Sequence, residues 1–552
     1  MNQASTSTGS LRTEAFAALL VAAALLAFSP TLRADFVAWD DPQLILENPL
    51  IRNFSPRIFA SFDPELYIPA TLLTFQIEHA IAGFSATVFH TTNLLLHALN
   101  VILIFWLLTL LLKNRTAAFI GALLFAVHPL NAEAVSWVSA RKELLMAAFS
   151  LGSLIAYVRS EGRSSRSLLV SLLLFALALL SKVTAITLPV LLLVIDWYEG
   201  RRISMRSILE KWPYFGLSAI FGIVALFGKS HTVSVLSIFD ILLLAIRSTV
   251  FYLSKFFAPF NLSAIYPAPT DLTLTSGAQL LAIGILIVFL GITVALRHRI
   301  RGMSAGMLLF LIALIPSFLA YEKANEITLA ADRYAYLPLV GLVLAIGALV
   351  KEIAPSGMAR RAAILAALVL SSILGVLSWQ QSQLWRSTET LFTNVLRVHP
   401  ESAIAMNNIG FLRLTEGNIE EALPLFEEAV MRNPEYVDAY VNLGATYGRA
   451  SRYDDAEDAL KKALAIDPTE AQAHYNLAGV HQERANNEGA IQEYEKTIEL
   501  RPSHAPAHYQ LALLYLKFGR EAEARATYEE LLEIDPTYRG KAESLDRLLN
   551  NP

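Results

Sequence analysis

Long apolar segments alternate with short polar loops through the first 380 residues of the chain. One apolar run spans roughly Phe16 to Leu32, and further runs recur near 89–112, 116–128, 141–158, 167–180, 183–196, 211–228, 239–258, 278–296, 304–320, 333–350 and 361–379. Several are shorter than the roughly 20 residues of a perpendicular span. They are either extended by their flanks or broken at membrane depth, which is tolerated beside protein or water. The pattern predicts a polytopic helical membrane domain.

After residue 400 the pattern becomes polar, helical and repetitive. Prolines recur every 34 residues, at Pro434, Pro468, Pro502 and Pro536, and alanines keep the same period. That period is the signature of the tetratricopeptide repeat, which contains two helices. We expect repeats at 402–435, 436–469, 470–503 and 504–537, a half-repeat at 387–400 and a capping helix at 538–552. The predicted class is therefore all-α, with a membrane domain over 1–386 and an α-solenoid over 387–552.

Composition and charge agree with this division. The 552 residues are 55% hydrophobic and 17% charged, with a mean hydropathy of +0.46. This is too apolar for a soluble protein. The overall net charge of −4 conceals a basic first part and an acidic repeat region. The chain contains no cysteine, which excludes disulfides and thiolate chemistry.

The distribution of Lys and Arg predicts the orientation of the spans. If the N-terminus lies inside, the basic loops 113–115, 159–166, 199–211, 297–301 and 351–361 all lie inside. This arrangement requires segment 239–258, which contains Arg247 and Lys255, to be an in-plane or re-entrant helix. About eleven crossings result, and they place Asp40, Asp41 and the repeats outside. An uncleaved first span fits better than a signal peptide because many apolar spans follow.

Four polar groups fall on the predicted outer side. They are Asp40-Asp41, the stretch from His128 to Glu133, the cations Arg141, Lys142 and Lys182, and Asp332-Arg333-Tyr334. If 131–142 is helical, Glu133 and Arg141 lie near one face. A carboxylate can take the proton of an attacking hydroxyl, and cations can stabilise a departing phosphate. Such a group of residues suits a lipid-phosphate-linked sugar as donor.

Each of these residues also has a structural interpretation. Asp40-Asp41 could cap a short helix, Glu133 could pair with Arg141, and Asp332-Arg333 could be a structural ion pair. Arg141, Lys142 and Lys182 could extend their charged ends to lipid headgroups, and His128 before Pro129 favours a structural break. No metal-ligand spacing, phosphate loop or nucleophile elbow is present in the sequence, so we expect no metal site.

These motifs, in this order, resemble one known family. Phe36 to Asp41 with Asn48 is similar to its first-loop acidic motif, and His128-Pro129 through Glu133 to Arg141 is similar to its second-loop motif. Ser181-Lys182 and Asp332 to Pro338 continue the resemblance. The family is the transmembrane and tetratricopeptide-repeat O-mannosyltransferases with their bacterial relatives. Val183 after Lys182, in place of an acid, and the small number of repeats depart from the animal members.

The resemblance implies a GT-C glycosyltransferase fold. It implies transfer of a sugar, mannose in the family, from a polyprenyl-phosphate donor to Ser or Thr of a protein outside the membrane. Asp40 or Asp41 would be the general base, with Glu133 as the next candidate, and Arg141, Lys182 and Arg333 would bind the donor phosphate. No other cofactor is expected. Partners would be membrane lipid, lipid-linked sugar and a protein bound by the repeats, with no nucleic acid.

The short N-terminus and compact loops favour a bacterial inner-membrane protein with periplasmic repeats. Two other functions remain open at this point. One is a non-enzymatic membrane scaffold whose repeats recruit partners for envelope assembly. The other is a lipid-linked-sugar transferase that acts on glycan or lipid. A single span would suffice for an anchor, so the many spans and the clustered charges favour an enzyme.

Overall fold

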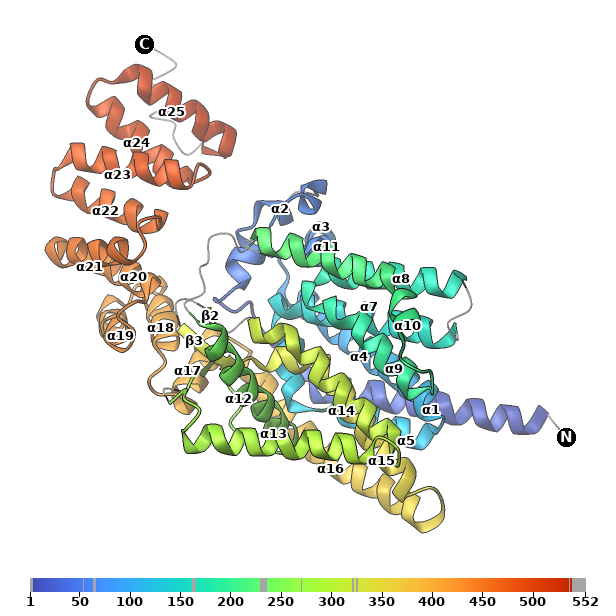
Figure 1. Cartoon of the computed structure of the whole chain (residues 1–552). Helices are drawn as coiled ribbons and strands as arrows, with labels where there is room; N and C mark the ends of the chain where they lie inside the picture. Colours follow the sequence, from blue (N-terminus) through green and yellow to red (C-terminus); the bar gives the residue numbers. More distant parts are fainter. Residues whose placement is uncertain are drawn as a thin grey trace. The chain divides into compact units, whose positions relative to one another are not determined.

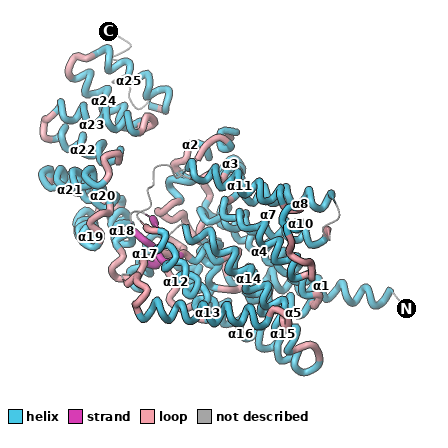
Figure 2. Tube along the Cα trace, in the orientation of Figure 1, coloured by secondary structure: helices cyan, strands magenta, loops and turns pink. Residues whose placement is uncertain are grey.

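The computed structural model describes residues 3–52, 54–62, 66–160, 165–228, 236–269, 271–319, 322–323, 326–535 and 537–538. Helices dominate the chain (Figures 1 and 2). It divides into one compact unit formed by 1–323 and 327–399 and a second formed by 324–326 and 400–552. The predicted boundary at residue 387 places α17 (Thr388–Val398) with the repeats, whereas contacts group this helix with the first unit.

The first unit contains seventeen named α-helices within the described residues. Those before residue 200 are α1 (Gln3–Ala27), α2 (Pro49–Arg52), α3 (Pro69–Ala82), α4 (Ala86–Leu112), α5 (Arg115–Ala126), α6 (Ala132–Ser136), α7 (Arg141–Arg159), α8 (Ser165–Ser181) and α9 (Leu188–Tyr198). The remainder, besides α17, are α10 (Met205–Leu209), α11 (Trp212–Gly228), α12 (Ile238–Phe257), α13 (Gly277–Leu296), α14 (Arg301–Leu314), α15 (Pro338–Ile353) and α16 (Gly357–Leu384).

Four of the described helices are long and apolar enough to cross a membrane, or five if the bent pair 115–126 and 129–136 counts as one span. They are Ala86–Leu112, Gly277–Ala295, Arg301–Leu319 and Gly357–Leu384. The predicted count of eleven is not confirmed, because many apolar helices, such as Trp212–Gly228, are shorter than 18 residues. The helix α12, which covers segment 239–258, is not among these candidates. The apolar helices indicate a multi-pass membrane protein.

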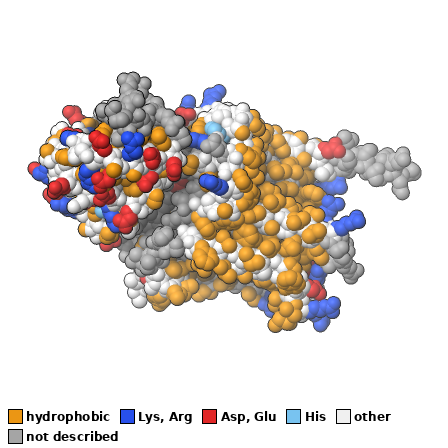
Figure 3. All heavy atoms as spheres, turned by 90° about the horizontal axis from the view of Figure 1, so that it is seen from above, with side chains coloured by type: hydrophobic (Ala, Val, Ile, Leu, Met, Phe, Trp, Pro, Cys, Tyr) orange, Lys and Arg blue, Asp and Glu red, His pale blue; other side chains and the backbone are white. Residues whose placement is uncertain are grey.

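The surface of the first unit fits a membrane environment. Figure 3 shows hydrophobic side chains over most of its visible face, whereas the repeat unit carries interspersed acidic and basic side chains. The exposed apolar residues include Leu281 and Ile287 on α13 and Leu365 and Ile373 on α16. Contiguous exposed apolar surface of this extent is rare on soluble monomers.

Close helix packing holds the centre of the first unit together. A Cβ added to Gly306 of α14 would lie 2.3 Å from the carbonyl oxygen of Gly341 on α15, and one added to Gly341 would lie 2.5 Å from that of Gly306. Small residues allow membrane helices to approach in this way. The approach fixes the start of α15 and therefore the short 3-10 helix η8 (Asp332–Ala335) just before it.

A buried hydrogen-bond network joins α4 to η8 and α7. The Nδ1 atom of His97 lies 2.8 Å from the hydroxyl of Tyr336, and Asn100 donates to that hydroxyl at 3.2 Å and to the carbonyl of Leu144 at 3.0 Å. All three side chains are buried. Since buried polar groups are stable when they are paired, this network sets the position of Arg333 relative to α7.

The segment 131–142 is not one helix. After α6 the chain is extended at Trp137 (φ −93°, ψ 124°), forms the 3-10 helix η5 (Val138–Ala140) and then enters α7. The condition under which Glu133 and Arg141 would share a helix face is therefore not met. The cause is the tertiary environment, in which Trp137 stacks between Trp39 and Trp385 at centroid distances of 5.1 and 5.6 Å.

A small three-stranded sheet of order β1-β3-β2 departs from the predicted all-α class. Its strands are β1 (Tyr266–Pro267), β2 (Glu322–Lys323) and β3 (Glu326–Ala330), with β1 antiparallel to β3 through Tyr266 opposite Ala330 and Pro267 opposite Thr328. The two-residue strands β1 and β2 are too short to give a period-2 pattern, whereas β3 alternates polar and apolar residues from Glu326 to Leu329, a signal that the prediction did not use.

The second unit consists of four helix pairs, one for each predicted repeat. They are α18 (Ala403–Thr415) with α19 (Ile419–Arg432), α20 (Val437–Arg449) with α21 (Tyr453–Ile466), α22 (Ala471–Glu483) with α23 (Asn487–Leu500), and α24 (Ala505–Lys517) with α25 (Glu521–Ile534). The predicted capping helix over 538–552 lies almost wholly outside the described residues. The four predicted helix pairs are thus present in the structure.

Candidate active site

The two adjacent acids of the first loop occupy different environments. Asp41 is fully buried, and its carboxylate accepts the backbone N–H of Val37 at 2.8 Å, that of Ser139 at 3.1 Å and the hydroxyl of Ser139. It therefore ties the first loop to η5. Burial raises the pKa of Asp41 to about 6, although the hydrogen bonds from Ser139 and Val37 act in the opposite direction. Asp40 remains half-buried, at the start of the short π-helical turn η2 (Pro42–Leu46).

Glu133 faces Arg333. The carboxylate of Glu133 forms an ion pair with the Arg333 guanidinium and accepts the Arg333 backbone N–H at 3.1 Å. Both side chains are almost fully buried. The contact joins α6 to η8 across 200 positions of sequence, and it takes the place of the Glu133–Arg141 pair that the sequence left open as an alternative.

Arg141 is enclosed by the protein. Its guanidinium pairs with Glu78 at 2.5 Å, donates to the Asn93 side chain at 2.8 Å and to the Phe89 carbonyl at 2.7 Å, and lies 4.5 Å from the ring centroid of Phe75. The side chain is 0% exposed. These contacts occupy the guanidinium within the protein core, which leaves it without an open side toward a ligand. Arg141 is thus placed to hold α3, α4 and α7 together.

Lys182 is also paired within the protein. Its ammonium forms an ion pair with Glu143 of α7 and lies 4.6 Å from the ring centroid of Tyr334. A small cavity of about 20 Å³ adjoins this pair and is lined by Glu143, Arg333, Tyr334 and residues of α14 and α15. The partner of Lys182, Glu143, thus lines an enclosed space together with Arg333.

Lys142 differs from every other cation here. It is 6% exposed, yet no described residue forms a hydrogen bond or an ion pair with its ammonium. Its electrostatic neighbours are Asp40 and Glu143, which attract it, and Lys182 and Arg333, which repel it. Burying an unpaired charge is costly. Sequence reasoning placed Lys142 beside Arg141 but did not select it as a site residue.

We refer to Asp40, Glu133, Glu143, Lys142, Lys182 and Arg333 together as the Lys142 cluster. Glu133 neutralises Arg333 and Glu143 neutralises Lys182, so the ammonium of Lys142 is the cation without an ion-pair partner among the described residues. Asp40 acts electrostatically on both Lys142 and Arg333. A half-buried carboxylate beside a poorly compensated cation can hold an anion and accept a proton at adjacent positions.

Two further predicted residues have structural partners. The Nε2 atom of His128 lies 3.0 Å from the Phe256 carbonyl, and its Nδ1 accepts the Leu130 N–H, so His128 caps the 3-10 helix η4 (Pro129–Asn131). Asp332 accepts the Tyr266 hydroxyl at 3.0 and 3.2 Å. Burial, and then the charge of Glu133, raises the pKa of Asp332 well above its ordinary value, which favours its protonated form.

Sequence reasoning missed three residues that organise the site. Glu78 and Glu143 neutralise Arg141 and Lys182, and Ser139 holds Asp41. Glu78 interrupts an apolar run and Glu143 follows two cations. An acid in such a segment indicates a buried ion pair, so the sequence contained a signal for both residues. Nothing in the sequence distinguished Ser139 from other small polar residues.

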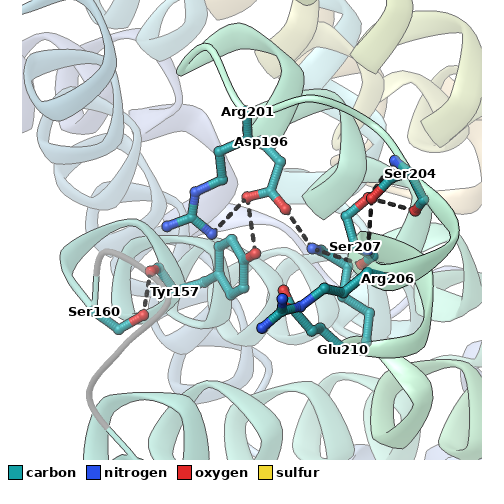
Figure 4. Close-up of polar contacts among 9 residues, drawn as sticks. Tyr157, Ser160, Asp196, Arg201, Ser204, Arg206, Ser207 and Glu210 are labelled. Carbon is teal, nitrogen blue, oxygen red and sulfur yellow. Dashed lines mark hydrogen bonds and ion pairs between the residues drawn. The ribbon is translucent and has the colours of Figure 1, made fainter.

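A second buried charge cluster lies elsewhere in the first unit. Asp196 of α9 accepts hydrogen bonds from the Tyr157 hydroxyl at 2.8 Å and from the Arg201 guanidinium at 3.3 Å (Figure 4). It also forms an ion pair with Lys211. We refer to these four residues as the Asp196 cluster. Lys211 also donates to the Ser207 carbonyl at 3.3 Å. Every charge in this cluster has a partner within the protein.

Comparison with known proteins supports both parts of the chain. Residues 68–228 match the family model described as dolichyl-phosphate-mannose-protein mannosyltransferase. Residues 379–430, 410–471 and 475–539 match a tetratricopeptide-repeat model. The first match includes Glu133, Lys142 and Lys182, and it does not extend to Asp40 or Arg333.

Individual relatives are named as protein O-mannosyl-transferases. The mouse protein O-mannosyl-transferase TMTC1 is 33% identical over 208 residues, which are 33% of this chain and 22% of that protein. The human protein O-mannosyl-transferase TMTC3 is 26% identical over 412 residues, which are 66% of this chain and 44% of that protein. The chain thus spans less than two thirds of the length of these relatives. Among solved structures, the crystal structure of MamA has 25% identity and a TM-score of 0.25, covering 27% of this chain and 88% of MamA.

The membrane match precedes the repeat match, in the order that the motifs of the sequence predicted. The alignment with TMTC3 covers two thirds of the chain, so the similarity is not confined to the repeats. Both parts of the chain are therefore similar to the transmembrane and tetratricopeptide-repeat protein O-mannosyltransferases.

Proposed function

We propose that this protein is a GT-C type membrane glycosyltransferase that transfers mannose from a polyprenyl-phosphate donor to Ser or Thr hydroxyls of a protein. The reaction would take place on the outer face of a bacterial inner membrane, with the repeats in the periplasm. The observation that carries the proposal is the nearly buried ammonium of Lys142, which has no ion-pair partner among the described residues and is attracted electrostatically by Asp40. A donor phosphate would supply the missing partner.

The proposed reaction is a single displacement. Asp40 takes the proton of the acceptor hydroxyl while the oxygen of that hydroxyl attacks C1 of the sugar. The bond between C1 and the phosphate oxygen breaks, and the lipid phosphate leaves with the electron pair. Lys142, with Lys182 and Arg333 behind it, stabilises the charge that develops on the leaving group. Displacement from the opposite side inverts the configuration at C1.

The environments of the other candidates fit supporting roles. Asp41 is enclosed and fully hydrogen-bonded, so it orients the loop that presents Asp40. Glu133 holds Arg333, and Arg141 holds the helices beneath the site. We therefore assign the base to Asp40 rather than to Asp41 or Glu133, and the first phosphate contact to Lys142 rather than to Arg141.

A scaffold without catalytic activity is the main alternative. It would need one anchor, whereas this unit buries several cations and carboxylates at the ends of different helices. Such burial is expensive in a membrane protein and usually marks a functional site. The Lys142 cluster therefore favours an enzyme over a scaffold.

The experiment that tests the function uses the purified full chain in lipid nanodiscs. Radiolabelled polyprenyl-phosphate mannose is added with a Ser- and Thr-containing protein, and the labelled product is identified. We expect label on a hydroxyl of the protein. Label on a glycan or lipid would move the proposal to a related transferase, and no transfer of any kind would favour the scaffold.

The proposed orientation can be tested separately. A reporter enzyme that is active only in the periplasm, fused after Leu391, should be active, because the basic loops are expected inside. Activity of a cytoplasmic reporter at the same position would contradict an outward-facing site.

A further inference from the structure

We propose that α17 is a positioning element of the active site, which fixes the loop of Asp40 through Thr388 and the segment that supports Arg333 through Asn394. This inference deepens the proposed function and rests on it. The sequence of α17 keeps the phase of the repeats, whereas its contacts group the helix with the first unit. Those contacts give α17 its role in the active site.

The start of α17 is well defined. The Ser387 hydroxyl accepts the Thr390 N–H at 3.2 Å, and the Thr390 hydroxyl accepts the Ser387 N–H at 3.1 Å. Such a reciprocal cap fixes the first turn of a helix. Two of the buried side chains of α17 are polar, those of Thr388 and Asn394. Buried polar groups need partners, and both residues find theirs in other segments of the first unit.

Thr388 holds the loop that carries Asp40. Its hydroxyl accepts the Ala38 N–H at 2.9 Å, and the Arg386 carbonyl, just before the helix, accepts the Asp35 N–H at 3.0 Å. Both bonds hold the main chain of the loop, and Ala38 lies two residues before Asp40. The position of the proposed base therefore depends on the first turn of α17.

The ring of Phe392 supports the same loop. It is fully buried and lies edge-on to Trp39, with 5.7 Å between the ring centroids. Trp39 directly precedes Asp40 and stacks on Trp137. An aromatic pair of this geometry is stabilising, so α17 holds the loop by a side-chain contact as well as by the hydrogen bond to Thr388.

Asn394 holds a second segment of the first unit. Its NH₂ group donates to the Leu262 carbonyl at 3.2 Å. The next residue, Ser263, donates its N–H to the Tyr266 hydroxyl at 2.8 Å. Asn394, Leu262, Ser263 and Tyr266 are all buried, so water does not compete for these hydrogen bonds.

Tyr266 connects this segment to Arg333. Its hydroxyl donates to Asp332 at 3.0 Å, and Asp332 directly precedes Arg333 in η8. The ring of His399, which follows α17, lies edge-on to Tyr266 at a centroid distance of 5.9 Å. One helix therefore contacts both the loop of the proposed base and the segment that holds the residue before Arg333.

A helix that holds both segments sets their separation. A misplacement of about 1 Å at a reacting group can cost about 100-fold in rate. In the proposed reaction Asp40 acts on the acceptor hydroxyl, whereas Arg333 acts on the donor phosphate. We therefore expect Thr388 to influence turnover and Asn394 to influence donor affinity. A helix with a merely structural role would change neither quantity in the protein that remains folded.

The test uses the full chain in nanodiscs, with polyprenyl-phosphate mannose and a Ser- and Thr-containing protein. Thr388→Val keeps the size of the side chain and removes its hydroxyl, so kcat should fall about tenfold, with donor affinity unchanged. Thr388→Ser retains the hydroxyl and should keep most of the turnover. Asn394→Ala removes the bond to Leu262 and should weaken donor binding about three- to tenfold, with kcat little changed.

A matched control and a second readout accompany these variants. Thr393→Val makes the same replacement at an exposed position of α17 and should leave turnover and donor affinity unchanged. Amide hydrogen exchange of the full chain requires no activity and reports local opening. Thr388→Val should raise exchange at residues 35–41, and Asn394→Ala should raise it at 262–266, while the rest of the first unit stays as protected as before.

Normal kcat in Thr388→Val or normal donor affinity in Asn394→Ala would overturn the proposal. Increased exchange throughout the first unit would also overturn it, because α17 would then act on general stability. A native chain that transfers no sugar would instead reject the proposed function. The exchange pattern would in that case still decide whether α17 fixes the two segments.

Discussion

Two buried charge clusters in the first unit differ in one respect. In the Asp196 cluster, a single carboxylate is shared by Tyr157, Arg201 and Lys211, and every charge has a partner. In the Lys142 cluster, two cations have carboxylate partners and Lys142 has no hydrogen bond or ion pair with a described residue. A complete network stabilises a fold, whereas an incomplete one has room for a ligand. Whether every buried charge has a partner therefore distinguishes a structural cluster from a functional one more clearly than the degree of burial does.

Replacing Asp40 should have the largest effect. Asp40→Asn keeps the shape of the side chain and removes its ability to accept a proton, so the transfer rate should fall about 10²–10⁴-fold. The measurement is the initial rate of sugar transfer, with donor affinity determined by direct binding. Asp41→Asn is the matched control, and its transfer rate should fall less than that of Asp40→Asn, because Asp41 only orients the loop. Near-normal turnover of Asp40→Asn would show that Asp40 is not the general base.

The Asp196 cluster should respond in stability instead. Asp196→Ala leaves Lys211 buried without its partner, and removal of one partner of a buried pair costs about 3–5 kcal/mol. We expect a lower apparent melting temperature in detergent, with normal donor affinity in the protein that remains folded. The double variant Asp196→Leu with Lys211→Met should recover much of the stability. Loss of donor binding in that double variant would show that the comparison between the clusters is wrong.

Replacing Lys142 should weaken the binding of donor. Lys142→Met retains the length and loses the charge, and a hydrogen bond to a charged group contributes about 1.5–3 kcal/mol, which corresponds to about 10- to 100-fold in affinity. Lys142→Arg keeps the positive charge and should retain part of the donor affinity. Binding of polyprenyl-phosphate mannose, measured at several salt concentrations, checks the effect. An unchanged affinity together with increased thermal stability would identify Lys142 as a merely tolerated buried charge.

The smallest expected effect concerns pH. Burial raises the pKa of Asp41 from 3.8 to about 6, so the folded protein binds a proton on this group more tightly than the unfolded chain does. The contribution of Asp41 to stability is therefore present below about pH 4 and decreases as the pH rises to about 6. Melting temperatures measured across this range should show the decrease. Asp41→Asn should flatten it, and an identical profile in that variant would assign the titration elsewhere.

The sequence predicted the parts of this molecule that repeat or alternate. The 34-residue period located four helix pairs because identical positions recur in each. The sequence also placed four polar groups at the ends of different spans on one predicted side of the membrane, since acids and cations follow or interrupt apolar runs. It did not predict which acid meets which cation. Those pairings depend on the break at Trp137, which results from contacts with Trp39 and Trp385 far away in the chain.

The division of roles between Asp40 and Asp41 could not be read from sequence either. The two residues are adjacent and chemically identical, and only the approach of Ser139 encloses one of them. In the same way, the short strands and the exact ends of the spans depend on packing partners. Gly306 and Gly341 are an example. Their sequence positions do not show that α14 and α15 approach each other there, because that requires knowing which helix packs against which.

The stack of Trp39, Trp137 and Trp385 provides an optical signal at the site. Indole rings at centroid distances of 5.1 and 5.6 Å with nearly parallel planes couple their electronic transitions. Three of the seven tryptophans of the chain take part. Near-ultraviolet circular dichroism and intrinsic fluorescence should therefore report the assembly of the first loop, the second loop and the end of α16, so that arrival of a donor or acceptor can be followed in real time without any label.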